Sequence, residues 1–438
     1  MRKILGIVFF IMAGHVGAAG TLALSQAQID QLNALRVGTS VIVDEFPDGF
    51  GGSGSLRFER IDVYARGARI IVVASDGEHE LPHSRRIELI GASADGDVRA
   101  SLAFDPGFAN VAGGGSGPSG AFAITAAADA NGASIRSIPA AQALPPGVVP
   151  EIVAGNDALP SGHPMPDAIA IALAGAVPAT TTRGAIVGVD TDNELMSLRF
   201  SNNTSAAASW IADLFGAMNV MYQRDLNVLL QQGTTYLRTT TDPYTQTGTP
   251  ANPAELTEFG NYWQSHYGSV PRSFAMLLSG KASSGNQASG IAWVNAYCQM
   301  QSQGGSYSVN QVFTNPQIGI GYSALLVGHE LGHNFGANHT HCTDVSTGGA
   351  PTGSNTIDKC FSTEPGCYAG ATSCPTSGPG APAGTVMSYC NTRQCGPGGQ
   401  NVLQFHPTQI GVMSMLIAQN TPSCLAASAD MIFQNGFD

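Results

Sequence analysis

Apolar residues in the second half of the chain alternate between helical repeats and strand-like runs. Two sets recur at the three- and four-residue spacing of a helix face, namely Ile211, Leu214, Phe215, Met218 and Tyr222, and then Leu256, Phe259, Trp263 and Tyr267. Further helices are predicted after residue 319 and over residues 407–419. Strand-like runs lie at residues 184–190, 227–230, 235–239, 273–279 and 291–297. This alternation predicts an α/β domain with a mixed, mostly parallel twisted sheet.

The first half of the chain has a different pattern, in which short strand-like runs predominate. They lie at residues 36–43, 56–64, 68–74 and 86–91. The glycine-rich stretch at residues 113–120 predicts a flexible loop. Residues 179–183 form a polar run that ends in one basic residue, which is a candidate processing site. We therefore expect a β-rich N-terminal region over residues 20–183, a catalytic domain over residues 184–425 and a tail over residues 426–438.

The N-terminus has the pattern of a secretory signal peptide. Arg2 and Lys3 precede an apolar run at residues 4–12, and small residues follow up to Ala19. The alternative is a membrane anchor, but this run is too short to cross a bilayer. We expect residues 1–19 to be removed and the protein to be secreted and extracellular, with no membrane anchor.

Composition narrows the range of partners. The net charge is −12 and only 11% of the residues are charged, which argues against nucleic acid or an anionic membrane as a partner. All eight cysteines lie between Cys298 and Cys424, and an even number in an exported chain predicts disulfides. A second metal site is the alternative, but no CxxC spacing supports it. We expect a monomer.

The strongest chemical signal is a histidine cluster with the spacing HExxHxxGxxH. His329 and His333 are four residues apart, so both rings leave one face of a helix and can bind one zinc ion. Gly336 is suited to a left-handed turn that ends the helix, and this turn allows His339 to supply a third ligand. Three histidines leave one coordination position open, as in catalytic zinc sites.

Glu330 directly follows the first histidine and lies beside the ligand pair. A carboxylate in that place can take a proton from water that zinc activates. The sequence therefore predicts zinc-dependent hydrolysis with Glu330 as the general base.

These residues resemble the zinc signature of the metzincin metallopeptidases. A methionine in a tight turn beneath the zinc, the Met-turn, is the second element of that clan, and Met387 lies 48 positions after His339. The segment from His329 to His339 is most similar to the reprolysin (adamalysin-like) group. Residues 221–228 also resemble that group, and Ile291, Ala292, Trp293 and Val294 resemble its substrate-binding edge strand. The resemblance covers roughly residues 184–425.

The sequence departs from the reprolysin pattern at three positions. Thr340 stands where reprolysins usually carry an aspartate, so any fixing of the Met-turn by that aspartate is in doubt. His341 is a rival to His339 as the third ligand. Tyr389, two residues after the methionine, resembles a tyrosine of the astacin and serralysin groups that can join the zinc sphere. Tyr389 is therefore a candidate catalytic residue, and a pocket-wall aromatic is the alternative.

The resemblance implies a secreted zinc endopeptidase that acts on protein or peptide substrates. It also implies that residues 20–183 are an inhibitory prodomain and that Cys298 pairs with Cys424. Structural calcium is possible, with Asp190 or Asp192 as candidate ligands. No cysteine precedes Cys298, so a cysteine of the prodomain cannot occupy the zinc, and the mechanism of latency stays open. His163 and Asp167 are candidates to reach the metal, although ordinary loop residues are the simpler interpretation.

Two alternatives follow from the same residues. A metzincin-shaped adhesin or binding module without turnover would need the fold but not the general base. Residues 20–183 could also be a permanent domain of the mature protein. The intact Glu330 favours the enzyme.

Overall fold

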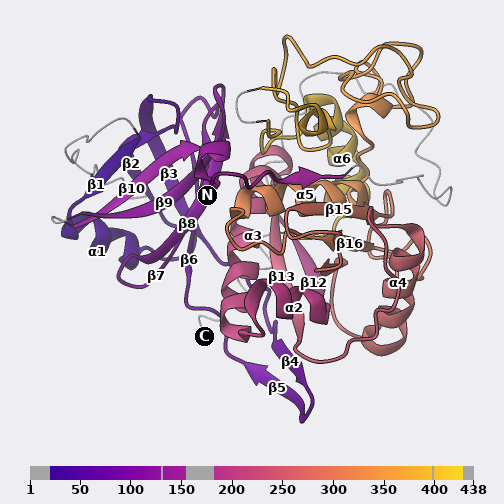
Figure 1. Ribbon diagram of the computed structural model, residues 1–438, viewed down its shortest axis with the longest axis horizontal. Helices are drawn as coiled ribbons and strands as arrows, with labels where there is room; N and C mark the ends of the chain where they lie inside the picture. The colour runs from indigo at the N-terminus through magenta and orange to yellow at the C-terminus, as the bar shows by residue number, and fades with distance from the viewer. Residues whose placement is uncertain (1–19, 130–131, 154–181, 397–398, 428–438) are drawn as a thin grey trace.

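The computed structural model describes residues 20–129, 132–153, 182–396 and 399–427. The predicted signal peptide, His163, Asp167 and most of the C-terminal tail lie outside these residues. The described chain forms two β-sheets with helices packed against them (Figure 1). The α/β class and the β-rich N-terminal region are both confirmed.

The N-terminal sheet has eight antiparallel strands in the order β1-β10-β9-β8-β7-β6-β3-β2. One helix, α1 (Gln26–Ala34), begins at Ser25 with a capping box. The core of this sheet is separate and contains Leu22, Phe58 and Phe104. The strands are β1 (Thr21–Leu24), β2 (Ser40–Pro47), β3 (Ser53–Ile61), β6 (Ile87–Ala92), β7 (Arg99–Asp105), β8 (Ala109–Gly117), β9 (Gly120–Asp129) and β10 (Gly132–Pro139).

The glycine-rich stretch at residues 113–120 is not a loop, as predicted, but part of the hairpin of β8 and β9. Its glycines are needed where the sheet is crowded. A Cβ atom at Gly113 would lie 2.2 Å from the carbonyl oxygen of Ser101, and one at Gly115 would lie 2.1 Å from that of Arg99. Glycine within a strand can indicate such a close approach rather than a loop.

The second sheet is mixed and mostly parallel, in the order β11-β15-β16-β14-β12-β13-β4-β5, with β17 paired to β12. Its core strands pair in parallel except at β15 and β16. The strands are β4 (Ile70–Ala74), β5 (Gly77–Leu81), β11 (Glu151–Ile152), β12 (Arg183–Thr191), β13 (Val228–Arg238), β14 (Phe274–Ser279), β15 (Gln287–Ala292), β16 (Tyr307–Gln311) and β17 (Ala426–Ala427).

Helices cover both faces of this sheet, because its strands are apolar on both sides. Along β14, Phe274, Met276 and Leu278 enter the core that contains α3 and α5. Ala275 and Leu277 enter the core that contains α4. The result is a three-layer α/β/α arrangement. The helices are α2 (Asn193–Phe200), α3 (Thr204–Leu226), α4 (Pro253–Tyr267), α5 (Ile320–Asn334) and α6 (Pro407–Gln419).

The predicted division at residues 183 and 184 does not separate the two sheets. The hairpin of β4 and β5 comes from the N-terminal region but extends the second sheet beyond β13 (Figure 1). At the opposite edge, β11 pairs with β15. The predicted tail also begins inside the fold, since Ala426 pairs with Gly184. The two-residue strands β11 and β17 and the β4–β5 hairpin show too little periodicity for the sequence to indicate which sheet they join.

Buried ion pairs join the N-terminal region to α3. Arg99 lies 2.8 Å from Asp225, and both side chains are almost fully buried. Arg86 forms a second ion pair with Asp213, which lies nearer the start of α3 than Asp225. Removal of one partner from such a pair leaves an uncompensated buried charge, so these contacts fix the N-terminal region in one position on α3.

The eight cysteines form four disulfides, and the predicted bond between Cys298 and Cys424 is confirmed. The other three tie down the segment that follows the histidine cluster: Cys342–Cys367, Cys360–Cys390 and Cys374–Cys395. Among the described residues, no helix is long and apolar enough to cross a membrane.

Candidate active site

The sequence places His329 and His333 on the last two turns of α5, which is buried along its length. The helix ends as predicted at Gly336, whose φ is +98°. The amide of Gly336 donates to the carbonyl of His333, and that of Ala337 donates to the carbonyl of Gly332. This pair of bonds is a Schellman motif. It reverses the chain so that His339 returns to the end of the helix.

The three histidines converge at one point. Nε2 of His333 lies 3.2 Å from Nε2 of His339, and the ring of His329 lies 4.8 Å and 5.2 Å from those two rings. Each Nδ1 has its own acceptor: the carbonyl of Val386 for His329, the carbonyl of Ala337 for His333 and the carboxylate of Glu364 for His339.

These acceptors place the ring proton on Nδ1 and direct the Nε2 lone pairs of the three histidines toward one another. Metal-binding histidines usually have such a partner on the other ring nitrogen. The three ligand atoms also lie within 4.8 Å of one another. The residues present therefore fit a zinc ion.

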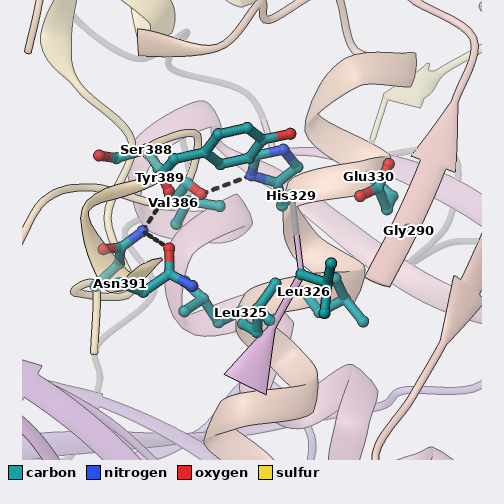
Figure 2. A pocket seen from close by; sticks show the side chains of 12 residues that line it. Gly290, Leu325, Leu326, His329, Glu330, Val386, Ser388, Tyr389 and Asn391 are labelled. Atoms are coloured by element: carbon teal, nitrogen blue, oxygen red, sulfur yellow. Dashed lines mark hydrogen bonds between the residues drawn. The ribbon is translucent and has the colours of Figure 1, made fainter. Parts of the chain in front are cut away.

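Glu330 lies against the sheet edge, directly over Gly290 of β15 (Figure 2). A Cβ atom at Gly290 would lie 2.3 Å from Oε1 of Glu330 and 2.4 Å from its Cγ. No residue other than glycine leaves room for the carboxylate in this place. The sequence contains a signal for this, because a glycine inside a strand often indicates a close approach.

Replacing Gly290 by alanine is expected to displace the Glu330 carboxylate from the histidine cluster. We expect kcat to fall by about 10²-fold, since general acid–base catalysis contributes about 10²–10⁴-fold, while zinc content stays at the wild-type level. Peptide hydrolysis and metal analysis of the purified variant test this. Replacing Gly319 by alanine, where an added Cβ atom has no neighbour within 4 Å, is the matched control. A Gly290→Ala variant with unchanged kcat would contradict the role given to this contact.

The turn that contains Met387 lies beneath the histidines. The carbonyl of Val386 orients His329, and the next carbonyl, of Met387, accepts hydrogen bonds from the amide and the hydroxyl of Thr340. Met387 is fully buried, and its sulfur packs on Gly332 of α5. Thr340 therefore ties the histidine segment to this turn at the position where reprolysins usually carry an aspartate.

The predicted edge strand is only partly correct. Ile291 and Ala292 end β15, but Trp293 and Val294 lie beyond it. The chain turns away at Asn295, whose φ is +53°. The amides of Asn295 and Ala296 then donate to the carbonyls of His333 and Asn334. The last carbonyls of a helix have no partner within the helix. Here the segment after β15 supplies their donors, and the chain leaves the sheet to do so.

The edge of β15 is already paired with the N-terminal region. The amide of Glu151 donates to the carbonyl of Asn286, and the amide of Val153 donates to the carbonyl of Ala288. β11 runs parallel to β15 in this pairing. The backbone groups that an extended peptide would use on this part of the edge are therefore occupied.

A small cavity lies between this edge, α5 and the Met387 turn (Figure 2). Apolar and polar residues both contribute to its wall, which is lined by Ile152, Val153, Gly290, Leu325, Leu326, His329, Glu330, Val386, Ser388, Tyr389, Asn391 and Asn401. Tyr389 stacks parallel to His329 at 5.9 Å and lies 4.5 Å from the ring of His339. The cavity therefore joins the predicted catalytic residues to two residues of the N-terminal region.

Comparison with known proteins agrees with this geometry. A reprolysin-type model of metallopeptidase family M12 matches residues 180–404, just over half of the chain. The chain belongs to the M12 metallopeptidase family. The predicted resemblance to the reprolysin group is thereby confirmed, and membership of this family supports a zinc-dependent peptidase.

The other comparisons add little about this M12 protein. The structure of metalloproteinase-II from Bacteroides fragilis aligns with a TM-score of 0.35 and 10% sequence identity, over 74% of this chain and 88% of that chain. Similarity at this level says nothing about activity. A search of curated proteins gave no match.

In this M12 domain, His341 stacks on His339 but lies outside the group of three histidines whose ring nitrogens converge. Its Nε2 lies 2.8 Å from Oε2 of Glu364, the same oxygen that His339 contacts at 2.7 Å. Partial burial raises the pKa of the Glu364 carboxyl, but the hydrogen bonds from His339 and His341 outweigh this and hold the pKa below its usual value. His339, and not its rival His341, therefore joins His329 and His333. No sequence motif identifies Glu364, which follows His339 by 25 residues.

The two aspartates considered for calcium have other partners in this M12 domain. Asp190 forms two hydrogen bonds with Arg238 and accepts others from Tyr244 and Trp263. Asp192 caps α2 through the amide of Leu195. These contacts are those of fold-stabilising residues, and calcium binding at these positions is not supported.

Proposed function

We propose that this protein is a secreted zinc-dependent endopeptidase in which His329, His333 and His339 hold the metal. The convergence of the three histidines, with Glu330 in the wall of the same cavity as His329, carries the proposal. Four disulfides accord with an extracellular location, because they persist in oxidising compartments. We further propose that α5 is the zinc helix and that the turn at Met387 is the Met-turn of the metzincins.

When bound, zinc supplies Lewis-acid activation of water and of the scissile carbonyl. Glu330 acts as the general base that takes the proton from water and then delivers it to the leaving amine. Once the N-terminal region has left, the edge strand that ends at Ile291 and Ala292 holds the substrate extended through main-chain hydrogen bonds. Tyr389 lies beside His329 and His339, where its hydroxyl can donate to the developing oxyanion.

Removal of zinc is expected to abolish the activity of the processed protein. The reason is that neither Glu330 nor Tyr389 can polarise a peptide carbonyl to the degree that a divalent cation does. Cleavage of casein with and without a chelator measures this, and re-addition of zinc is expected to restore the rate. Cleavage that persists after the metal has been removed, as verified by metal analysis, would refute the proposal.

The same experiment distinguishes the alternative of an adhesin or binding module. Such a protein would bind its partner without turnover, and casein would stay intact at every zinc concentration. Glu330 and the space that Gly290 leaves for it have no use in a protein that only binds. The enzyme is therefore the favoured function.

We also propose that residues 20–183 are an inhibitory prodomain and that β11 is its inhibitory element. Two observations support this. β11 pairs with β15 at Gln287 and Ala288, directly before the Ile291–Ala292 part proposed for the substrate, and Ile152 and Val153 line the cavity that contains His329 and Glu330. This mechanism needs no prodomain ligand on the metal, in keeping with the absence of a cysteine before Cys298.

Processing at the end of the predicted prodomain must spare β12. Arg183 is the first residue of that strand, and its amide donates to the carbonyl of Asn227. A cut directly after Arg183 would thus fall inside the sheet, so we expect the cut to lie before it. Any such cut leaves β11 in place on β15, and activation then also requires that the prodomain dissociates or is degraded.

A further inference from the structure

We propose that Glu364 is a positioning residue of the zinc site, held in place by His341 and fixing His339 for the metal. This inference rests on the proposed function and gives a role to His341, for which the HExxHxxGxxH motif provides none. It concerns a residue 25 positions beyond the motif. It also makes the disulfide-linked segment after the histidine cluster part of the site.

The first step is the difference among the three candidate ligands. His329 and His333 direct their Nδ1 atoms at the carbonyls of Val386 and Ala337. Only His339 directs its Nδ1 at a carboxylate, at 2.7 Å. A hydrogen bond to an ionised acceptor is roughly twice as strong as one between neutral groups. Glu364 therefore fixes the orientation of His339 more firmly than a carbonyl would, and it increases the basicity of that ring.

The second step is the role of His341. It reaches the same oxygen, Oε2 of Glu364, at 2.8 Å, and its ring stacks parallel to that of His339 at 5.3 Å and 7°. Both rings are almost fully buried. One carboxylate oxygen is thus held between two parallel imidazoles, and its position is determined by both. His341 acts on the metal only through Glu364.

The third step is what holds Glu364 near these rings. Cys342 directly follows His341, and it is bonded to Cys367, three residues after Glu364. The amide of Tyr368 also donates to the carbonyl of His341. The disulfide and the hydrogen bond together bring the two segments side by side. Without them, a loop of this length would hold the carboxylate only at a considerable cost in conformational entropy.

The test measures zinc retention rather than activity, on the chain of residues 20–438. Glu364→Ala removes the acceptor, and Glu364→Gln keeps an acceptor of the same size without the charge. We expect zinc affinity, measured by competition with a chromophoric chelator, to fall about 10–100-fold for Glu364→Ala, as for other residues that orient metal ligands. A smaller fall is expected for Glu364→Gln. Glu258→Gln, on α4, is the matched control and is expected to leave zinc affinity unchanged.

His341 is tested by the same measurement. His341→Leu is expected to weaken zinc binding, and His341→Gln, which can still donate to Glu364, is expected to restore most of it. The double variant His341→Leu/Glu364→Ala is expected to match Glu364→Ala alone, because His341 acts through Glu364. Cobalt substitution provides a second readout, since a misplaced His339 changes the visible absorption of the bound Co²⁺.

The outcomes separate this inference from the proposed function. Wild-type protein that binds no zinc would refute the proposed function itself. Wild-type protein that binds zinc, together with Glu364→Ala and Glu364→Gln variants of unchanged affinity and cobalt spectrum, would overturn only the role of Glu364. The metal-free melting temperature is expected to be similar for wild type and Glu364→Gln. A fall in zinc affinity that is equally large in Glu364→Gln and in the control Glu258→Gln would also overturn it.

Discussion

Replacing Glu330 by glutamine is expected to reduce kcat/KM for peptide hydrolysis by at least about 10³-fold while zinc binding persists. General acid–base catalysis contributes about 10²–10⁴-fold, and here one carboxylate serves both the attack of water and the departure of the amine. The glutamine side chain has almost the same size as that of glutamate, so it still fits over Gly290. A Cβ atom added at Gly290 would collide with the side chain at position 330. The expected loss is therefore chemical rather than steric.

Three measurements separate this prediction from a general loss of structure. Metal analysis is expected to give one zinc per chain in Glu330→Gln as in wild type. The melting temperatures of the two proteins are expected to agree closely. Glu258→Gln, which makes the same change on α4, is expected to keep full activity. Retention of more than about a tenth of the wild-type kcat/KM by Glu330→Gln would show that another group is the base.

The convergence of the three histidines could be predicted from sequence because the backbone geometry that produces it is local. A four-residue step on a helix places His329 and His333 side by side, and the glycine at position 336 makes the reversal that returns His339. The helix and the turn that bring these three residues together lie within the 11 positions from His329 to His339. No knowledge of the distant chain was needed.

The end of β15 could not be predicted in the same way. Trp293 and Val294 have the apolar and β-branched character of strand residues, and they follow a strand directly. The strand ends because the amides of Asn295 and Ala296 donate to the carbonyls of His333 and Asn334 at the end of α5 and not to a neighbouring strand. These partners are separated by 38 residues in each case, so local pattern carries no signal of the contact.

The parts of the site that depend on distant segments were missed for the same reason. Glu364 is one acidic residue in a loop rich in small and polar residues, and only the fold brings it to His339. β11 is two residues long, and nothing in its sequence indicates that it pairs with β15. Thr340 is a further case, since it replaces the expected aspartate with two hydrogen bonds to the same turn.

Disrupting β11 is expected to activate the unprocessed protein. The full chain of residues 20–438 is expected to be latent, because β11 pairs with β15 beside the proposed substrate strand and Ile152 and Val153 line the cavity of His329 and Glu330. Proline at positions 151 and 153 removes both amides that donate to β15, and proline cannot be accommodated in a paired strand without this loss. Two hydrogen bonds contribute about 1–3 kcal/mol in total, so we expect residual activity to rise by about tenfold or more, measured with a fluorogenic peptide.

The matched control keeps the two amides and changes the same side chains. Glu151→Gln/Val153→Thr has similar side-chain volumes, and it is expected to stay as latent as wild type. If this control were activated as much as Glu151→Pro/Val153→Pro, the side chains rather than the strand pairing would block the site. Full activity of the unmodified chain would remove the case for an inhibitory prodomain and would favour a permanent N-terminal domain.

The anchoring of the N-terminal region explains why the prolines should act locally. The β4–β5 hairpin on β13 and the buried pair of Arg99 and Asp225 hold this region independently of β11. Loss of the strand pairing therefore frees the edge of β15 without releasing the region as a whole. For the same reason, a cut before Arg183 alone is expected to leave the protein inactive until the N-terminal fragment is separated or degraded. Gel filtration of the cut protein, with activity assayed before and after separation, tests this last step.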